Sequence, residues 1–322
     1  MSLNFIIIGA QKAATSFVHD CLREHPSVQM AIDEIPSFES PDYEHGGKES
    51  ILYSYSAPQG MICGIKRPSY LGKPEVLDRI QALCPGAKLI LVLRNPVDRA
   101  VSAYFHYIKH RFIPCTDLST GMERLLDGSL QKSHPAAKDI LEYGFYGRHL
   151  RTYLDRFPKV QILVLFHEDI VADGKQAIRR VYRFLGIDPE YQPESIDSRP
   201  QAVLFQPFRI RVARLVSRLL FQHSADHQRI IAKQGNPVSR LVARALRKID
   251  RKILAPILKN TRPVLPESLR ESLVEAYRQD IEDLERILGR DLSAWKTSPK
   301  SRAKRSIRLA QRPAEPLSVA LG

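Results

Sequence analysis

A short apolar run followed by a glycine loop constrains the fold of this chain more than any other feature. The run is Phe5–Ile8, and the loop Gly9–Ser16 reads Gly-Ala-Gln-Lys-Ala-Ala-Thr-Ser. A buried strand that turns through such a loop into a helix presents backbone N–H groups and a positive helix end to an anion. Lys12 adds a charge, and the hydroxyls of Thr15 and Ser16 add donors. The segment predicts a phosphate site, with an ordinary surface turn as the alternative.

The sequence up to about residue 190 predicts an α/β fold. Short apolar runs bounded by turn residues alternate with helical patterns, as in a parallel sheet with crossover helices. The further strands expected are Val28–Ala31, Met61–Ile65, Lys88–Leu93 and Gln161–Phe166. The helices expected are Thr15–Arg23, one from the N-cap Asn95 through His110, Tyr146–Phe157 and Gly174–Leu185. We predict a P-loop-like parallel sheet flanked by helices, with a helical C-terminal extension.

From Pro207 onward the pattern predicts helices only. These are Phe208–Phe221, Val238–Leu258 and Pro266–Leu288, the last with Gly289 as its C-cap. Past Trp295 the chain is basic and poor in core residues, so we expect disorder there. The resulting division is an α/β core over 1–206 that contains the predicted phosphate site, a helical extension over 207–296 that completes the domain, and a basic tail over 297–322.

The net charge of +14 is regional. Residues 207–260 hold thirteen Lys and Arg against Asp226 and Asp250, and residues 296–312 hold seven and no acid. A charged outer face on packed helices is the favoured interpretation, followed by an interfacial helix on an anionic membrane. Binding of nucleic acid comes last, because no recognition motif accompanies the charge.

Cysteine spacing and hydropathy bear on the compartment. The four cysteines form no C-x-x-C pair, which favours free thiols in a reducing compartment. Phe5–Ile8 is too short for the apolar part of a signal peptide, and no stretch approaches the roughly 20 apolar residues of a membrane span. We expect a cytoplasmic protein, with peripheral membrane association left open.

The loop is not a Walker loop. That motif places lysine directly before the hydroxyl residue that holds magnesium, whereas Ala13 and Ala14 separate Lys12 from Thr15. The strand Lys88–Leu93 is followed by arginine rather than a metal-binding aspartate. A kinase that uses a magnesium triphosphate is therefore poorly supported.

Two motifs together resemble the sulfotransferase family. The pattern G-x-x-K-x-x-T-S after an N-terminal strand resembles its 5′-phosphosulfate loop, and Arg94 with Ser102 eight residues later resembles its 3′-phosphate motif. The resemblance implies 3′-phosphoadenosine 5′-phosphosulfate (PAPS) as the sulfonate donor, and no metal is expected. Arginine after a parallel strand lies where open α/β sheets bind ligands, and it binds phosphate bidentately. The donor-binding residues implied are Gln11, Lys12, Ala13, Ala14, Thr15, Ser16, Arg94, Ser102 and Tyr146.

The resemblance is to the branch of heparan-sulfate-type and bacterial carbohydrate sulfotransferases. It covers about residues 4–190 and, more loosely, 261–296. Asp33–Phe38 and Gly64–Tyr70 resemble its acidic–aromatic and lysine–Thr/Ser–Pro–x–Tyr segments, and the latter departs at Arg67 and Ser69. Tyr143–Tyr146 matches as well.

The resemblance implies Glu34 as the general base that takes the proton from the acceptor hydroxyl. Lys12, with Lys66 second, is expected to stabilise the charge that develops on the leaving phosphate. A solvated loop acid and a surface lysine are the alternatives for Glu34 and Lys66. Asp33 is the nearest substitute base, and the pair formed by His106 and His110 ranks below Glu34.

A sugar hydroxyl, free or on a glycolipid, is the acceptor that the resemblance favours, while lipids and small metabolites stay open. A non-catalytic nucleotide-binding protein of the same fold is the alternative from another class. Arg199 and Arg209 are candidates for a third residue at the 3′-phosphate. The family often has glycine where this chain has Ala14, and alanine fits there only if the position is already helical.

Overall fold

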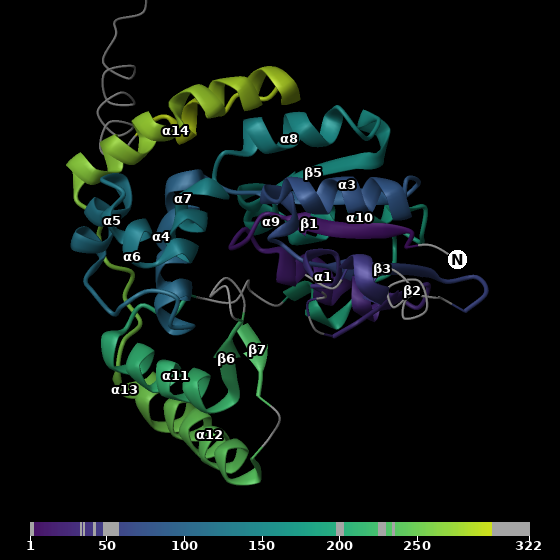
Figure 1. Ribbon diagram of the computed structural model, residues 1–322. Coiled ribbons are helices and arrows are strands. Elements are labelled where there is room, and N and C mark those ends of the chain that lie inside the picture. The colour runs from purple at the N-terminus through teal and green to yellow at the C-terminus, as the bar shows by residue number, and fades with distance from the viewer. Residues whose placement is uncertain are drawn as a thin grey trace, which may run out of the picture.

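The computed structural model describes residues 3–32, 34, 36–40, 43–47, 58–197, 203–224, 230–233 and 236–297. At its centre five parallel strands form one sheet in the order β2-β3-β1-β4-β5 (Figure 1). The strands are β1 (Phe5–Gly9), β2 (Val28–Met30), β3 (Ile62–Lys66), β4 (Lys88–Leu93) and β5 (Ile162–Phe166). The predicted α/β fold with a parallel sheet is confirmed.

The strands form because apolar runs in β1 and β4 are buried on both faces by flanking helices. The helices up to residue 206 are α1 (Thr15–Glu24), α3 (Pro74–Leu83), α4 (Pro96–Lys109), α5 (Leu118–Leu126), α6 (Ser129–Ser133), α7 (Asp139–Glu142), α8 (Tyr146–Leu154), α9 (His167–Ala172) and α10 (Gly174–Leu185). Sequence periodicity had predicted α1, α4, α8 and α10, and it had not predicted α3, α5–α7 or α9.

Strand order determines where a ligand binds. The central strand β1 lies between β3 and β4, and all three run in the same direction. Their carboxyl ends therefore lie at the same edge of the sheet. The chain adds β2 and β3 on one side of β1 and then β4 and β5 on the other side. In parallel sheets, ligands bind at the point where the strand order changes side in this way. The residues that end or follow these strands are Gly9, Lys66 and Arg94.

Helix α4 begins as its sequence predicts. The Asn95 side chain accepts hydrogen bonds from the N–H groups of Val97 at 3.0 Å and Asp98 at 3.1 Å, and Pro96 occupies the first turn. This cap fixes the direction in which α4 leaves the end of β4. The side chains on α4 are thereby positioned over the same sheet edge as the loop after β1.

The expectation of helices alone after Pro207 is wrong. Helices α11 (Pro207–Leu220), α12 (Pro237–Ile249) and α13 (Ala255–Ile257) are joined by a π-helical turn (Asp250–Leu254) and by an antiparallel pair of short strands, β6 (Phe221–His223) and β7 (Ile230–Ala232). The backbone becomes extended at Phe221 because contacts with residues at the end of α4 hold it there. Arg111 donates to the Phe221 carbonyl at 3.0 Å, and His223 Nε2 lies 3.0 Å from the His110 carbonyl oxygen.

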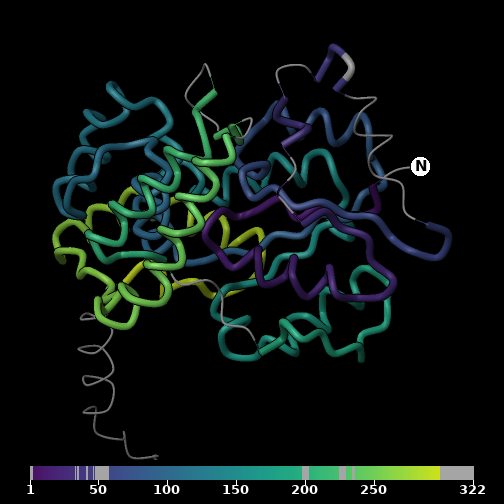
Figure 2. Tube along the Cα trace, turned by 90° about the horizontal axis from the view of Figure 1, so that it is seen from below, coloured from purple at the N-terminus to yellow at the C-terminus, as the bar shows by residue number. Residues whose placement is uncertain are grey.

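These elements form a lobe set apart from the sheet. Residues 207–260, the basic lobe, project below the sheet in Figure 1, and Figure 2 shows them in green over one side of the molecule, with the purple and blue strands on the other. Helices α11 and α12 pack side by side. Arg209 holds the pair together through a bidentate ion pair with Asp250, at 2.8 and 2.9 Å.

The last helix, α14 (Glu267–Leu288), returns to the core and packs against α8 (Figure 1). The Asp280 carboxylate accepts hydrogen bonds from the N–H groups of Gly147 and Arg148, each at 2.8 Å, at the first turn of α8. Gly289 ends α14 in the left-handed conformation that the sequence predicts, with φ of 62°. Trp295 then donates to Glu168 at 2.9 Å. The predicted tail beyond residue 297 lies outside the described residues.

Candidate active site

A cleft of about 520 Å³ opens at the sheet edge where β1 and β4 end. Among the described residues that line it, the Lys and Arg side chains outnumber a single acid, so the cleft attracts anions. Its cations are Lys12, Arg94, Lys109 and Arg262. The other lining residues are Gln11, Ala14, Thr15, Ser16, Phe17, Glu34, Pro68, Ser102, His106, His110, His167, Val203 and Phe205.

The loop after β1 forms one end of this cleft. It turns through the left-handed region at Lys12 and Ala14, with φ of 69° and 75°. Ala14 is therefore the N-cap of α1 in a conformation that favours glycine, and the condition under which alanine would fit without strain is not met. The first-turn N–H groups of Thr15 and Ser16 have no acceptor within the helix, so they are available to an anion.

The loop lies close to the neighbouring chain. A methyl group on Gly9 would come within 2.7 Å of Leu71 Cβ, so glycine is needed where β1 enters the loop. Ala13 is fully buried and its N–H donates to the Ala10 carbonyl at 3.2 Å. The buried Gln11 Oε1 has no hydrogen-bond partner within the described part of the chain.

Lys12 carries its charge at an electrostatic cost. Burial, followed by the neighbouring charges of Lys109 and Arg94, lowers the pKa of Lys12 to about 8. An anion in the cleft would offset both effects, because it replaces lost solvation and neutralises the like charges. The ammonium is thus arranged to receive a negative group.

Arg94 and Ser102 lie at the β4–α4 side of the cleft. Arg94 donates to the Lys12 carbonyl at 3.0 Å, which ties the end of β4 to the loop. Ser102 is 2 % exposed, and its Oγ has no partner among the residues that the structure describes. A buried hydroxyl without a hydrogen-bond partner costs free energy. The Ser102 hydroxyl therefore indicates a ligand atom at this position.

Two cations lie next to the Glu34 carboxylate. Its Oε1 lies 3.4 Å from Lys66 Nζ and its Oε2 lies 3.3 Å from Arg67 Nη1. Lys66 is buried and also donates to the Ser16 hydroxyl at 3.2 Å. The carboxylate side chain is 40 % exposed and lines the cleft, so an acceptor can reach it. The structure thus brings Glu34, Lys66 and the loop together.

A second carboxylate, Glu39, holds Arg67 in place and was not predicted from the sequence. Glu39 is buried and receives Arg67 through two hydrogen bonds, at 3.2 and 2.8 Å, as well as the Ser69 hydroxyl and Lys73 at 3.5 Å. Burial alone would raise the pKa of Glu39, but the Arg67 guanidinium, Lys73 and Ser69 outweigh it and hold the pKa below its ordinary value. Arg67 therefore bridges two carboxylates, Glu34 and Glu39.

The two histidines on α4 also line the cleft. Their ring centroids are 4.5 Å apart. Burial, then Lys12, holds the pKa of His106 well below its ordinary value, and burial, then Lys109, lowers the pKa of His110 to about 3. Imidazoles with so little proton affinity are weak general bases near neutral pH, which favours Glu34.

Not every predicted residue lines the cleft. Tyr146 is buried, packs against Trp295 and is absent from the cleft wall. Arg209 is paired with Asp250 inside the basic lobe. Asp33 and Arg199 lie outside the described residues.

Two cations of the cleft were not predicted. Lys109 comes from the last turn of α4, and Arg262 comes from the segment before α14, where it pairs with Asp98 at 2.8 Å. Arg262 brings the C-terminal part of the chain to the cleft. No local motif marks it in the sequence, because its position depends on how the chain crosses back from the basic lobe.

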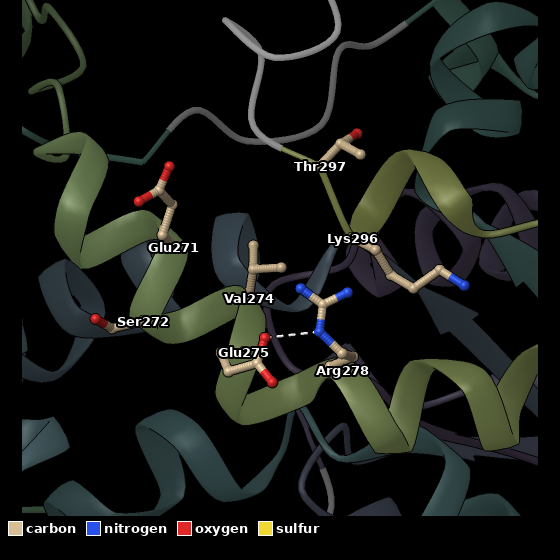
Figure 3. Close-up of a pocket in the computed structure, with 7 residues that line it drawn as sticks. All are labelled: Glu271, Ser272, Val274, Glu275, Arg278, Lys296 and Thr297. Atoms are coloured by element: carbon tan, nitrogen blue, oxygen red, sulfur yellow. Dashed lines mark hydrogen bonds and ion pairs between the residues drawn. The ribbon is translucent and has the colours of Figure 1, made fainter.

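A second hollow, of about 510 Å³, lies beside α14 (Figure 3). Glu275 and Arg278 on its wall form an ion pair with each other at 2.6 Å, and Lys296 pairs with Glu285. Three of its four charged side chains therefore already have partners, and none of its lining residues ends or follows β1, β3 or β4. We assign the site to the cleft at the sheet edge.

Comparison with known proteins agrees with this fold. The family described as "Sulfotransferase domain" matches residues 3–219. Heparan sulfate glucosamine 3-O-sulfotransferase 3A1 of Mus musculus is 35 % identical over 186 residues, which are 56 % of this chain and 45 % of that protein. Bifunctional heparan sulfate N-deacetylase/N-sulfotransferase 2 of Homo sapiens is 30 % identical over 199 residues, or 58 % of this chain and 22 % of that protein.

A solved structure of a sulfotransferase from Alicyclobacillus acidocaldarius shares the fold. Its TM-score is 0.60 at 22 % identity, and the match covers 92 % of this chain and 100 % of that one. The parallel sheet and its flanking helices have a sulfotransferase-type fold, and the chain belongs to the sulfotransferase domain family. It spans less than half the length of the curated relatives compared here.

The described residues lack two features. No helix among them is long and apolar enough to cross a membrane. No three His, Cys, Asp or Glu side chains among them gather as a metal-binding group. The metal-free reaction and the cellular location stay predictions.

Proposed function

We propose that the cleft binds PAPS and that the chain transfers its sulfonate to a hydroxyl group, on a carbohydrate or a glycolipid. The observation that carries this proposal is that one cleft is lined both by residues of the loop Gly9–Ser16 and by Arg94 and Ser102. Each of these two groups would bind one anionic end of a ligand. A donor with phosphate groups at both its 5′ and 3′ positions matches such a cleft.

The residues divide between the two ends of the donor. The amides and hydroxyls of Thr15 and Ser16, with Lys12, would hold the 5′-phosphosulfate at the start of α1. Arg94 and the unpartnered Ser102 hydroxyl would hold the 3′-phosphate. Arg262 lines the same cleft and replaces Arg199 and Arg209 as our choice for a third contributor.

Glu34 would remove the proton from the acceptor hydroxyl. The carboxylate is exposed to the cleft, and the bridging cations Lys66 and Arg67 orient it. Because Lys66 also touches Ser16, it links the base to the loop that would hold the sulfonate. The donor supplies a sulfonate whose bond to a phosphate breaks, and Lys12 and Lys66 would stabilise the charge left on that phosphate.

The acceptor class comes from the relatives. Both are named for heparan sulfate, which makes a sugar the acceptor class we propose. The 3-O-sulfotransferase is named for transfer to a sugar oxygen and supports a hydroxyl acceptor, whereas the N-sulfotransferase is named for transfer to nitrogen. The segment that carries Glu34 would contact that acceptor, because Glu34 lines the cleft. We also infer that residues 207–296 complete the domain with the core over 1–206, because Arg262 reaches the cleft and α14 packs on α8.

Transfer of labelled sulfonate tests the proposal. Radiolabelled PAPS is incubated with the chain and with a panel of glucosamine-containing oligosaccharides, and the label in the sugar fraction is counted. Glu34→Gln should lower transfer by at least 100-fold and leave the affinity for 3′-phosphoadenosine 5′-phosphate (PAP) within about twofold, since general base catalysis contributes roughly 10²–10⁴-fold.

Glu75→Gln is the matched control, because Glu75 is an exposed carboxylate on α3. It should transfer like the unaltered chain. Near-normal turnover in Glu34→Gln would refute the assignment of the base. PAP binding without transfer to any acceptor would favour a non-catalytic nucleotide-binding protein.

A further inference from the structure

The described part of the basic lobe presents cations without anionic partners. Its described residues contain one acid, Asp250, and the bidentate ion pair with Arg209 occupies that acid. The exposed cations of α12 and the turn after it are Arg240, Arg244, Arg247, Lys248, Arg251 and Lys252. Such a surface complements a partner that carries many negative charges.

The same helix exposes an apolar strip beside those cations. Val238, Val242, Ala245 and Ile249 follow the spacing i, i+4, i+7 and i+11, so they share one side of α12. None of them is buried, and Val238 is 65 % exposed. Helix α12 packs on α11 through another face that includes the buried Ala243. The apolar strip therefore faces solvent.

Apolar and basic side chains also alternate on α11. After Pro207 its exposed positions are Phe208, Arg211, Leu215 and Arg218, which again follow helical spacing. Between α11, the β6–β7 pair and α12 lies a groove of about 770 Å³. Leucines of α11 and Phe221 supply its apolar lining, and Arg218, Lys233, Arg240 and Arg247 supply its charge.

We propose that the basic lobe binds the surface of an anionic phospholipid bilayer. Exposed aliphatic side chains next to unpaired cations are what an interfacial helix uses, since the cations contact lipid phosphates while the apolar side enters the acyl boundary. A nucleic acid would complement the charge but leave the aliphatic strip in water. The lobe is fixed to the end of α4 by Arg214, Arg111 and His223, so membrane binding would hold the cleft at a set distance from the bilayer.

Vesicle co-sedimentation of the full chain tests this proposal. The chain is mixed with vesicles of phosphatidylcholine alone or with 30 mol% phosphatidylglycerol, at about 0.15 M salt. The lobe proposal predicts at least tenfold stronger binding to the anionic vesicles. The triple variant Arg244→Gln, Lys248→Gln, Lys252→Gln should lose at least tenfold of that binding. The double variant Val242→Ser, Ile249→Ser should also lose several-fold.

The matched control removes three exposed cations from α10 instead, through Lys175→Gln, Arg180→Gln and Arg183→Gln. It has the same change of net charge and should bind the vesicles like the unaltered chain. PAP affinity should be unchanged in all variants, which shows that they are folded and separates this proposal from the proposed function.

Five outcomes would overturn the proposal. Equal binding to both kinds of vesicle would remove the role of charge, and equal losses in the α10 and α12 variants would mean that net charge alone is responsible. Unchanged binding in the α12 variant would assign the membrane contact to another part of the chain. Tight binding of random-sequence RNA without vesicle binding, or a dimer that the Val242→Ser, Ile249→Ser variant dissolves, would identify a different partner.

Discussion

The burial of Lys12 should make the affinity for the donor depend on pH. Its pKa of about 8 means that the free protein loses this charge as the pH rises through 8. A bound anion favours the protonated form, so affinity is full below pH 8 and falls above it. We expect PAP to bind about tenfold more weakly at pH 9 than at pH 7, since one pH unit above the pKa leaves about a tenth of the lysines charged.

Calorimetric titration between pH 6.5 and 9.5 measures this change. Lys12→Arg is the control variant, because arginine keeps its charge over the whole range. Its PAP affinity should vary much less with pH. The same tenfold fall in Lys12→Arg would place the titrating group elsewhere.

Ala14 is the position at which a single substitution should stabilise the fold. Alanine with φ of 75° is strained, and glycine adopts that conformation without steric cost. Ala14→Gly should therefore raise the free energy of unfolding by up to about 1 kcal/mol. Ala245→Gly, at an exposed position inside α12, should lower it by about 1 kcal/mol, because the helical φ there favours alanine.

Chemical denaturation of both variants separates the two effects. Opposite signs would support the left-handed loop position. A loss of stability in both would contradict it.

The predicted site residues differ in how far local sequence determines their positions. Arg94 and Ser102 both line the cleft, because a strand end and a capped helix fix where residues eight apart will lie. Glu39 could not be predicted, because its contacts with Arg67 and Lys73 depend on how one segment folds over the end of β3. The left-handed conformation of Ala14 was left open by the sequence for a similar reason, since both loop conformations suit a strand–loop–helix unit.

At the scale of elements, Asp280 joins α14 to α8. One buried carboxylate satisfies two N–H groups of the first turn of α8. Asp280→Asn keeps the shape but offers a single acceptor oxygen, so one N–H group loses its partner. We expect the free energy of unfolding to fall by about 1–3 kcal/mol in a denaturation experiment.

Glu271→Gln on the same helix is the control, because Glu271 is exposed and its substitution should change stability by less than about 0.5 kcal/mol. A similar small effect for Asp280→Asn would show that α14 is not held through α8. It would also weaken the inference that residues 207–296 complete the domain.

Elements with a strong local signal were predictable, and elements held by distant contacts were not. Strands β1 and β4 are continuous apolar runs, and α4 has a clear cap. By contrast, β6 follows α11 without any break in the apolar pattern, and its extended backbone depends on Arg111 and His223. The helix expected over Val238–Leu258 is interrupted by a π-helical turn at Asp250, where the ion pair with Arg209 holds the chain.

At the scale of the whole molecule, the positive charge gathers in two places. One is the cleft at the sheet edge, with Lys12, Arg94, Lys109 and Arg262, and the other is the basic lobe. Helix α4 joins them, since it carries Ser102 and His106 into the cleft and meets α11 at its far end. Net charge alone would not distinguish a donor site from a membrane-binding surface, but the position of the charges in the fold does.

The central claim is that one cleft holds two separate phosphate sites. Calorimetric measurement of the affinities for PAP and for adenosine 5′-phosphate, which lacks the 3′-phosphate, tests it without knowledge of the acceptor. We predict that PAP binds at least 100-fold more tightly, and that Arg94→Gln with Ser102→Ala removes most of this difference while adenosine 5′-phosphate still binds. Equal affinities for the two nucleotides in the unaltered chain would contradict the account.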